Sequence, residues 1–395
     1  MPLPFAQLFI GFGMTLYFGG QMSEPQVAEL LRSVGVQISD GHISNLLIKD
    51  QGAFHAEKDA LYRAGLASSP WQHLDDTSTR VHGQNGYCHI ICNPLYTAYF
   101  TTEAKDRLTV LDVLTNRRPR RFLVNAEALG FLEACGLSAV RRQQLAQLPG
   151  DTILDDVAIH ALLEAHLPGW GPQQRQWSLD ATAVAAYHAE LESPVVRLLV
   201  CDDAPQLTLV TDELALCWVH AGRHDKTLVP YVPQHRVLLE DFVQRFWLYY
   251  AQLLAYRAHP TPVEAVRLTR EFEILFATVT GYEALDERIA KTCTKQGCLL
   301  MVLAHPEIPL HNNPAELGAR ARVRKRDVSF GPRTREGATA WDTFMTLAET
   351  ATKLGVSFYH YMHDRVSGAY QMPSLADLIA TRAQRLNLGA SWNTA

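Results

Sequence analysis

The stretch Val195-Val196-Arg197-Leu198-Leu199-Val200-Cys201-Asp202-Asp203 decides the fold. It is apolar except at Arg197 and ends in two acids. A continuous apolar run of this kind is typical of a central or parallel strand that helices cover on both faces. Acids at the carboxyl end of such a strand lie at the sheet edge where open α/β sheets bind ligands. The stretch therefore predicts an α/β protein with a ligand site beside its end.

Further strands and helices are predicted on both sides of this run. Residues 87–92 and 95–100 are rich in aromatic and β-branched side chains, and Asn93-Pro94 separates them, which predicts a strand, a turn and a second strand. The apolar run 214–219 predicts another strand. Helices are predicted over 107–114, over most of 125–190, and over 236–290 and 341–354. In the segment 236–290 one apolar stripe is interpreted as core: Phe242, Phe246, Tyr249, Tyr250 and Leu253.

The first 70 residues predict a small helical segment. Residues 3–20 carry no charge, and we expect a buried helix there rather than a membrane span, because glycines and a proline interrupt a stretch that is short for a bilayer. Ser23 and Gln26 have capping-box spacing, and Gly35 ends that helix. A second helix is predicted from Ser39 onward. Two helices joined by a short turn form a candidate helix-turn-helix, although any pair of antiparallel helices has the same pattern.

Composition excludes several classes of protein. The chain has 395 residues, of which 47% are hydrophobic and 19% charged, with a net charge of −5. This composition is that of a folded globular protein and excludes a wholesale polycation, although a local basic patch can still bind nucleic acid. Seven irregularly spaced cysteines do not form the pattern of a secreted disulfide framework. We therefore expect a cytoplasmic protein that does not associate with membranes.

Acidic residues recur at three places that bear chemistry. They are Asp75-Asp76-Thr77, Asp202-Asp203, and the Glu316 that ends Asn312-Asn313-Pro314-Ala315-Glu316. The first two are expected where apolar strands end, and the third opens a segment that is helical after its proline. Three converging carboxylates offer the hard oxygen ligands that Mg²⁺ and Mn²⁺ prefer. Each acid alone is as well explained as a turn or cap residue, so order and spacing carry the argument.

Four separated motifs resemble the insertion-sequence transposases of the sixty-six family, which belong to the DDE group. They are Asp75-Asp76-Thr77, Asp202-Asp203-Ala204-Pro205-Gln206-Leu207, Cys217-Trp218-Val219-His220 and Asn312-Asn313-Pro314-Ala315-Glu316. The resemblance runs from about residue 22 to about residue 385. Two features depart from the family: His311 stands where many relatives have Asp, and longer relatives carry an additional N-terminal zinc-binding and helix-turn-helix region.

The resemblance implies a fold and a division into parts. The fold class is α/β, an RNase H-like mixed sheet flanked by helices, with a helical insertion and a small helical N-terminal segment. Residues 1–70 form the helical N-terminal segment. Residues 71–235 form the first part of the catalytic core, with a helical insert near 125–190. Residues 236–305 form the helical insertion between the last two acids, and residues 306–395 complete the core with the catalytic Glu and a basic helix.

The resemblance also implies the activity and its metal ligands. Asp75, Asp202 and Glu316 are the expected catalytic residues and ligands of two Mg²⁺ or Mn²⁺ ions per active site. The expected function is metal-dependent cleavage at transposon ends followed by strand transfer into target DNA. The partners are then double-stranded DNA, further copies of the chain as a homo-oligomer on DNA, and candidate accessory proteins. The alternatives are a non-catalytic DNA-binding derivative of a transposase and an RNase H-like nuclease.

The neighbouring residues of these motifs leave alternatives open. Adjacent side chains of a strand point to opposite faces, so only one member of each Asp pair is expected to bind metal. Asp75 and Asp202 are favoured, and Asp76 and Asp203 are secondary candidates, as are Asn312 and Asn313. A basic cluster after Glu316 is expected to bind DNA phosphates: Arg320, Arg322, Arg324, Lys325 and Arg326.

The Cys217-Trp218-Val219-His220 motif has two interpretations. With His224, Cys293 and Cys298 it forms a loose version of a zinc site, which normally needs four ligands with local pairs. The favoured interpretation is a packed cysteine together with a DNA-facing His220 near Arg223.

Overall fold

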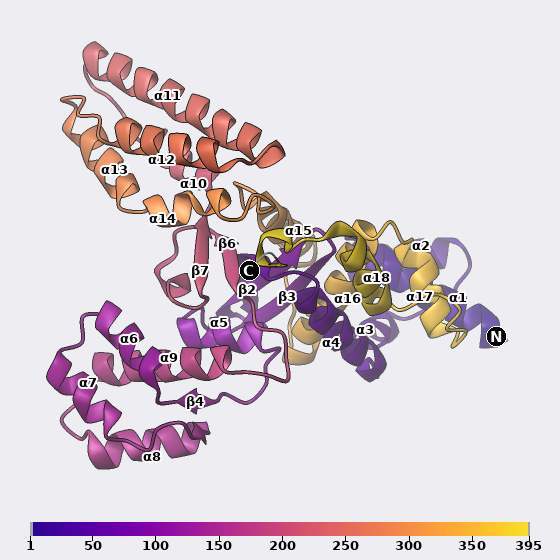
Figure 1. Cartoon of the computed structure of the whole chain (residues 1–395). Coiled ribbons are helices and arrows are strands. Elements are labelled where there is room, and N and C mark those ends of the chain that lie inside the picture. The colour runs from indigo at the N-terminus through magenta and orange to yellow at the C-terminus, as the bar shows by residue number, and fades with distance from the viewer. Residues whose placement is uncertain (1–2, 394–395) are drawn as a thin grey trace.

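A five-stranded mixed sheet forms the centre of the protein, whose computed structural model describes residues 3–393 (Figure 1). The strand order is β3-β2-β1-β6-β7. β2 pairs antiparallel with β1 and with β3, whereas β1, β6 and β7 are mutually parallel neighbours. The strands are β1 (Trp71–Val81), β2 (Gln84–Asn93), β3 (Tyr96–Thr102), β6 (Leu198–Cys201) and β7 (Glu213–Leu216). The prediction of an α/β protein is confirmed.

Helices cover both faces of this sheet and form three groups around it (Figure 1). The first group follows β3 and contains a two-stranded sheet: α5 (Arg107–Leu114), β4 (Phe122–Leu123), α6 (Ala126–Ala134), α7 (Ala139–Ala146), β5 (Ile153–Leu154), α8 (Asp156–His166) and α9 (Pro172–His188). The second follows β7: α10 (Trp218–Asp225), α11 (Pro233–Ala258), α12 (Pro262–Phe276), α13 (Glu283–Cys293) and α14 (Gln296–Leu299).

The third group joins the two ends of the chain. The N-terminal helices α1 (Leu3–Met14), α2 (Glu24–Ser33), α3 (Asp40–Ile48) and α4 (Gly52–Ala67), with a π-helical turn at Thr15–Gly19, lie against the C-terminal helices α16 (Arg335–Lys353), α17 (Phe358–Val366) and α18 (Leu375–Leu386) (Figure 1). Between the second and third groups, α15 (Asn313–Ser329) crosses the sheet at β1 and β2. The N-terminal segment is therefore part of the fold's main body.

Most elements occur where the sequence predicts them. The capping box of Ser23 and Gln26 is formed, Ser39 caps α3, and α5 has the predicted bounds. The apolar stripe of α11 is core, since Phe242, Phe246, Tyr249 and Leu253 are buried. The predicted strand over 214–219 is wrong at its end, because Trp218 already begins α10. No helix within residues 3–393 is both long and apolar enough to cross a membrane.

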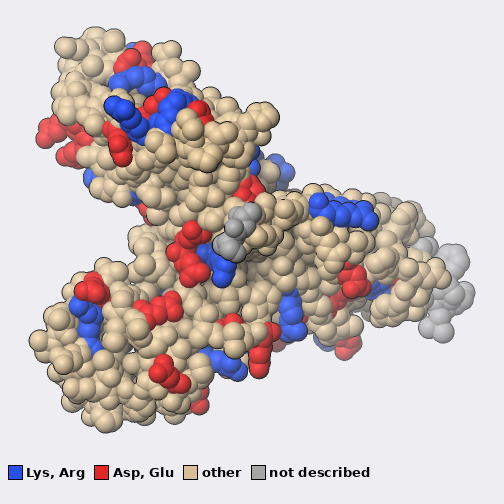
Figure 2. All heavy atoms as spheres, viewed as in Figure 1, with Lys and Arg blue, Asp and Glu red and all other residues tan. Residues whose placement is uncertain are grey.

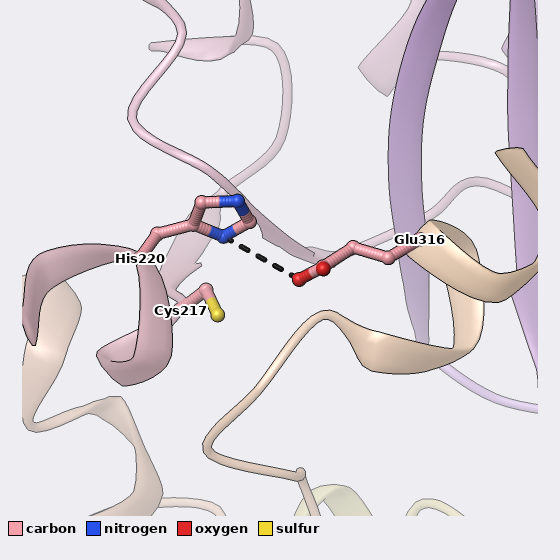
Figure 3. Close-up of side chains that lie close together, drawn as sticks. All are labelled: Cys217, His220 and Glu316. Carbon is pink, nitrogen blue, oxygen red and sulfur yellow. Dashed lines mark ion pairs between the residues drawn. The ribbon is translucent and has the colours of Figure 1, made fainter. Parts of the chain in front are cut away.

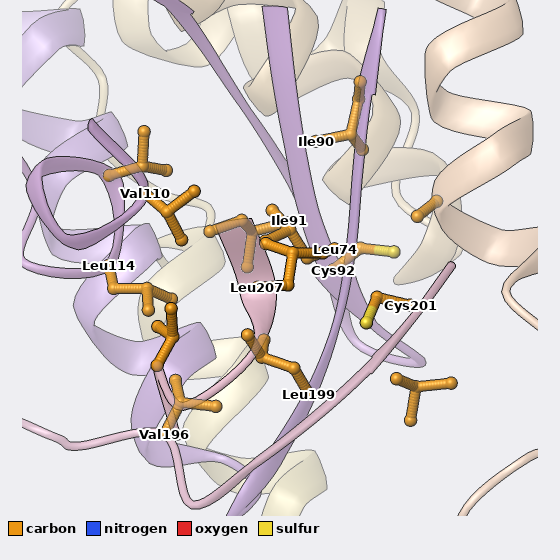
Figure 4. Close-up of a cluster of buried hydrophobic side chains, with 14 of the residues drawn as sticks. Leu74, Ile90, Ile91, Cys92, Val110, Leu114, Val196, Leu199, Cys201 and Leu207 are labelled. Carbon is orange, nitrogen blue, oxygen red and sulfur yellow. The ribbon is translucent and has the colours of Figure 1, made fainter. Parts of the chain in front are cut away.

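A continuous apolar core lies between the sheet and its helices. In Figure 4, Val110 and Leu114 of α5 point toward Leu74, Ile91 and Leu199 of the sheet. These five side chains are at most 2% exposed. Burial of such side chains stabilises a fold by roughly 1.5–3 kcal/mol each. The core therefore fixes the strands that carry the acids.

Helix α16 covers the open edge of the sheet with side-chain hydrogen bonds. The outward N–H groups of β3 at Thr97, Tyr99 and Thr101 donate to side-chain oxygens of Thr350, Thr346 and Asp342, at 3.2, 3.1 and 2.6 Å. The three acceptors recur every four residues along one helix, and the three donors recur every two residues along the strand. Because the two spacings match, these N–H groups of the edge strand all have hydrogen-bond acceptors. Without the helix, the strand would offer them unpaired to another chain.

Replacement of Thr346 by Val should therefore destabilise the protein. The hydroxyl accepts from the buried Tyr99 N–H, and the isosteric Val leaves that donor without a partner, at a cost of about 1–3 kcal/mol. The matched control is Thr352→Val, because the Thr352 hydroxyl is exposed and bonds only to Ala348 of its own helix. Equilibrium urea unfolding measures both, and equal stabilities of the two variants would contradict the proposed role of the edge contact.

Candidate functional site

The three favoured acids come from three different elements. Asp75 lies within β1, Asp202 directly follows β6, and Glu316 lies in the first turn of α15. The expectation that Asp75 follows the end of a strand is wrong, because β1 continues to Val81 in its pairing with β2. Asp75 instead follows the point where the pairing of β1 with β6 ends.

The sheet register brings the ends of β6 and of its pairing with β1 close to Asp75 and Asp202. His73 of β1 pairs with Val200 of β6 in parallel register. Asp75 lies two residues further along β1, so its side chain projects to the same face as His73, whereas that of Asp76 projects to the other face. Asp202 directly follows the last residue of β6, and its charge contributes to raising the Asp75 pKa. This arrangement favours Asp75 and Asp202 over the secondary candidates.

Helix α15 lies on that same face and presents Glu316. Asp75 pairs across β1 and β2 with Ile90, and a Cβ on Gly318 would lie 2.8 Å from the Ile90 side chain. Only glycine permits this close approach of the helix to the sheet. Glu316 lies two residues before Gly318, and its charge contributes to raising the pKa of Asp75.

A buried amide fixes the start of α15. The side chain of Asn312 is fully buried, and its Nδ2 donates to the carbonyl oxygen of Leu74 at 2.8 Å. Its Oδ1 lies 2.9 Å from Nδ1 of His73. Because burial lowers the pKa of His73 to about 3, the ring is neutral, and Nδ1 donates this hydrogen bond. Asn312 is therefore a positioning residue, whereas Asn313 is exposed.

Burial and neighbouring charges oppose the ionisation of Asp75 and Asp202. Burial, together with the charges of Asp202, Asp76 and Glu316, raises the pKa of Asp75 to about 7, against one hydrogen bond from the Asp76 N–H. Burial also raises the pKa of Asp202, which His220 opposes. Carboxylates that share a site resist ionisation together unless a positive charge joins them.

The surroundings of Glu316 add a thiol and an imidazole. The ligand atoms of Cys217, His220 and Glu316 all lie within 4.8 Å of one another (Figure 3). His220 Nδ1 is 3.7 Å from Glu316 Oε1, too far for a hydrogen bond, and both atoms are buried without a hydrogen-bond partner. The other oxygen, Oε2, accepts from both terminal nitrogens of Arg223, at 3.2 and 3.3 Å.

Among the described residues, the group of ligand atoms close enough to hold a metal ion is Cys217, His220 and Glu316, and it includes neither Asp75 nor Asp202. Asp75, Asp202 and the unpartnered Oε1 of Glu316 are hard oxygen donors of the kind that Mg²⁺ and Mn²⁺ prefer, but their oxygens do not form one such close group. The zinc set needs further ligands, but among the described residues the group around Cys217 includes neither His224 nor the cysteines 293 and 298. Cys217 is buried, and its sulfur accepts the Asn312 N–H at 3.3 Å. This is the packed cysteine that the sequence favoured.

The two alternative acids are neutralised elsewhere. Asp76 lies 3.2 Å from the Lys105 ammonium, and Asp203 forms an ion pair with Lys295 of the second helical group. Sequence reasoning did not identify either lysine, because Lys105 and Lys295 lie far from the acids along the chain and in no motif. The lysines balance charge next to the site, and the charge of Lys105 also acts to lower the pKa of Asp202.

The expected phosphate contacts are wrong for Arg322 and Lys325, because both side chains are buried. Arg322 is 1% exposed, donates to Thr101 Oγ1 at 2.7 Å and lies 3.2 Å from Asp342. Lys325 is 0% exposed and donates to the carbonyl oxygens of Tyr17 and Met22 at 2.6 and 2.7 Å. The two cations hold α15 to the edge strand and to the N-terminal segment.

The other basic residues of α15 remain available in part. Arg320 and Arg324 are exposed, whereas Arg326 is half-buried and donates to the Ser78 carbonyl oxygen at 2.6 Å. His220 and Arg223, which the sequence predicts to face DNA, both lie beside Glu316. On the face in Figure 2, Lys and Arg are interspersed with Asp and Glu. A phosphate-binding surface there must therefore be local.

Replacement of Asp75 by Asn should stabilise the metal-free protein more at high pH than at low pH. The folded-state pKa of Asp75 is raised to about 7 from an unfolded value near 3.9, so the folded state binds the extra proton and loses stability as pH rises through that range. Asn removes this penalty, and the stability gain should increase by more than about 1 kcal/mol from about pH 5 to about pH 8. Urea unfolding with a chelator measures it. Parallel pH curves for wild type and variant would contradict the assignment, and Asp203→Asn is the control.

Comparison with known proteins gives one relative. No family model and no solved structure matches the chain. The chain is 31% identical over 341 residues to the uncharacterized protein y4jO of Sinorhizobium fredii, and the match covers 82% of this chain and 100% of that protein. This chain therefore belongs to the same family as y4jO.

Proposed function

We propose that this protein is a DDE-type DNA transposase that resembles the insertion-sequence transposases of the sixty-six family and has an RNase H-like core. The observation that carries the proposal is the arrangement of Asp75, Asp202 and Glu316, which come from three separate elements, with the charges of Asp202 and Glu316 contributing to the raised pKa of Asp75. The strand order β3-β2-β1-β6-β7, in which β2 runs against its neighbours, is that expected of an RNase H-like sheet and supports the proposal.

In this proposal the three carboxylates hold two Mg²⁺ or Mn²⁺ ions. Such a pair supplies an activated water or hydroxyl nucleophile and stabilises the leaving oxygen of an in-line displacement. Water first cleaves a phosphodiester at the transposon end and frees a 3′-hydroxyl, which then attacks a phosphodiester of the target DNA. The bond that forms replaces the one that breaks, so no covalent protein intermediate is required.

The remaining residues of the site position these groups. Arg223 holds Oε2 of Glu316, and Oε1 lies 3.7 Å from His220 Nδ1 without a hydrogen-bond partner. Asn312 fixes the turn before Glu316, and Asp76 and Asp203 are balanced by Lys105 and Lys295. The intact set of acids favours a catalytic protein over the non-catalytic DNA-binding alternative.

Replacement of Asp202 by Asn should abolish DNA cleavage. Asn keeps the shape of the side chain and removes the charge that holds the cation, so activity should fall by at least about 100-fold. Nicking of supercoiled plasmid DNA in Mg²⁺ or Mn²⁺ measures the loss, and DNA binding and the unfolding midpoint should stay close to wild type. Asp203→Asn is the matched control, since Asp203 lies next in sequence but pairs with Lys295. Loss of cleavage in the control alone would transfer the role to Asp203.

Removal of the exposed arginines of α15 should weaken DNA binding and its salt dependence. If Arg320 and Arg324 contact phosphates, the double alanine variant should flatten the slope of log affinity against log salt by up to about 2. The control removes two exposed arginines on other helices, Arg63 and Arg270. Equal slopes for both double variants would exclude the α15 contacts.

A further inference from the structure

A large aromatic side chain is exposed at the end of α15. Phe330 is 90% exposed and occupies the C-cap position with φ +58° and ψ 17°, the left-handed conformation. The left-handed conformation is energetically unfavourable for a bulky residue. Such strain in folded proteins concentrates at functional sites. Exposure of the ring to water and the strained backbone both make phenylalanine unfavourable at this position. The stability of the fold therefore does not explain why this residue is present.

The backbone that carries Phe330 is held in place. Arg326 donates to the Ser78 carbonyl oxygen, and the turn of the β1–β2 hairpin bonds to the next residues: the His82 N–H donates to the Pro332 oxygen at 3.5 Å, and His82 Nδ1 lies 3.2 Å from the Arg333 oxygen. A Cβ on Gly331 would lie 3.2 Å from the Arg80 oxygen. The ring therefore projects from a rigid support.

The hollow beside the ring has the chemistry of a nucleotide site. It has a volume of about 690 Å³, and its lining includes Phe330, Arg80, Arg326, Asn85 and Tyr87, with Asp327 as its acid. Arg80 donates to Asn85 Oδ1 at 3.1 Å, which orients its guanidinium. An aromatic face stacks on any nucleobase, and guanidinium groups bind the phosphates on either side.

The hollow and the candidate catalytic site lie at opposite ends of the same helix, α15. Fourteen residues separate Glu316 from Phe330, which corresponds to about 21 Å at 1.5 Å per residue. The exposed Arg320 and Arg324 lie between them on α15. At 3.4 Å per base pair this separation is roughly six base pairs of duplex DNA. One DNA segment that follows the helix can therefore contact both ends.

We infer that Phe330 stacks on a nucleobase of bound DNA, with Arg80 and Arg326 on the adjacent phosphates. The inference rests on the proposed function, since it names a second contact of the same DNA. The ring unstacks a base step about six base pairs from the reacting phosphate and so fixes the register of the DNA relative to Glu316.

The test uses Phe330→Asn and Phe330→Trp in the full-length protein. Asn tolerates the left-handed conformation and removes the ring, so folding is preserved, whereas Trp keeps a stacking face. The probe is a short duplex that carries 2-aminopurine, whose fluorescence rises when its base is unstacked. The matched control is Tyr231→Ala, because Tyr231 is an aromatic of 95% exposure that lies between α10 and α11.

Phe330→Asn should weaken binding by about 5- to 100-fold and abolish the fluorescence rise, while Phe330→Trp and Tyr231→Ala retain both. Unchanged affinity and fluorescence in Phe330→Asn, with wild-type cleavage that still depends on Asp202, would overturn this inference and leave the proposed function intact. Binding that depends on Phe330 without cleavage that depends on Asp202 would overturn the proposed function alone. Failure of the wild type to bind the duplex would overturn both, and a Phe330-dependent self-association without DNA binding would assign the surface to a protein partner.

Discussion

The hydrogen bonds of one buried amide, Asn312, hold together the elements that form the candidate site. Its side chain bonds to His73 and to the Leu74 carbonyl oxygen of β1, and its N–H donates to the sulfur of Cys217 at the start of α10. Buried polar groups of this kind are costly when a partner is lost, so the three elements keep a single arrangement. The position of Glu316 relative to Asp75 follows from it.

The two neighbouring acids Asp75 and Asp76 differ in how their negative charge is balanced. Asp75 lies on the face of α15, where burial and neighbouring carboxylates oppose its ionisation, whereas Asp76 on the other side is paired with Lys105. Glu316 is paired with Arg223, so the acids of the site whose pKa values are raised are Asp75 and Asp202. In the proposed function, divalent cations would relieve the repulsion between these carboxylates.

Helix α15 has separate roles on its different sides. Gly318 brings it against the sheet, and Arg322 and Lys325 anchor it to the edge strand and to the N-terminal segment. Its exposed side carries Arg320 and Arg324 and leads from Glu316 toward the strained aromatic at its end. The two helical groups inserted after β3 and β7 extend away from the N- and C-terminal helices (Figure 1), and α10 of the second group contacts the first turn of α15 through the Arg223–Glu316 pair.

The sequence by itself determined those elements that local signals specify: the apolar run before Asp202 is a central strand, and Ser23 and Ser39 cap the helices that they predict. Only the tertiary structure decided which side of α15 meets solvent. The basic residues after Glu316 cannot be told apart in the sequence. In the structure Arg322 and Lys325 are buried, because they bond to Thr101 and Tyr17, which lie hundreds of residues away along the chain. The ion pairs Asp76–Lys105 and Asp203–Lys295 likewise join residues 29 and 92 positions apart. Pairing over such separations depends on packing, which local spacing does not encode.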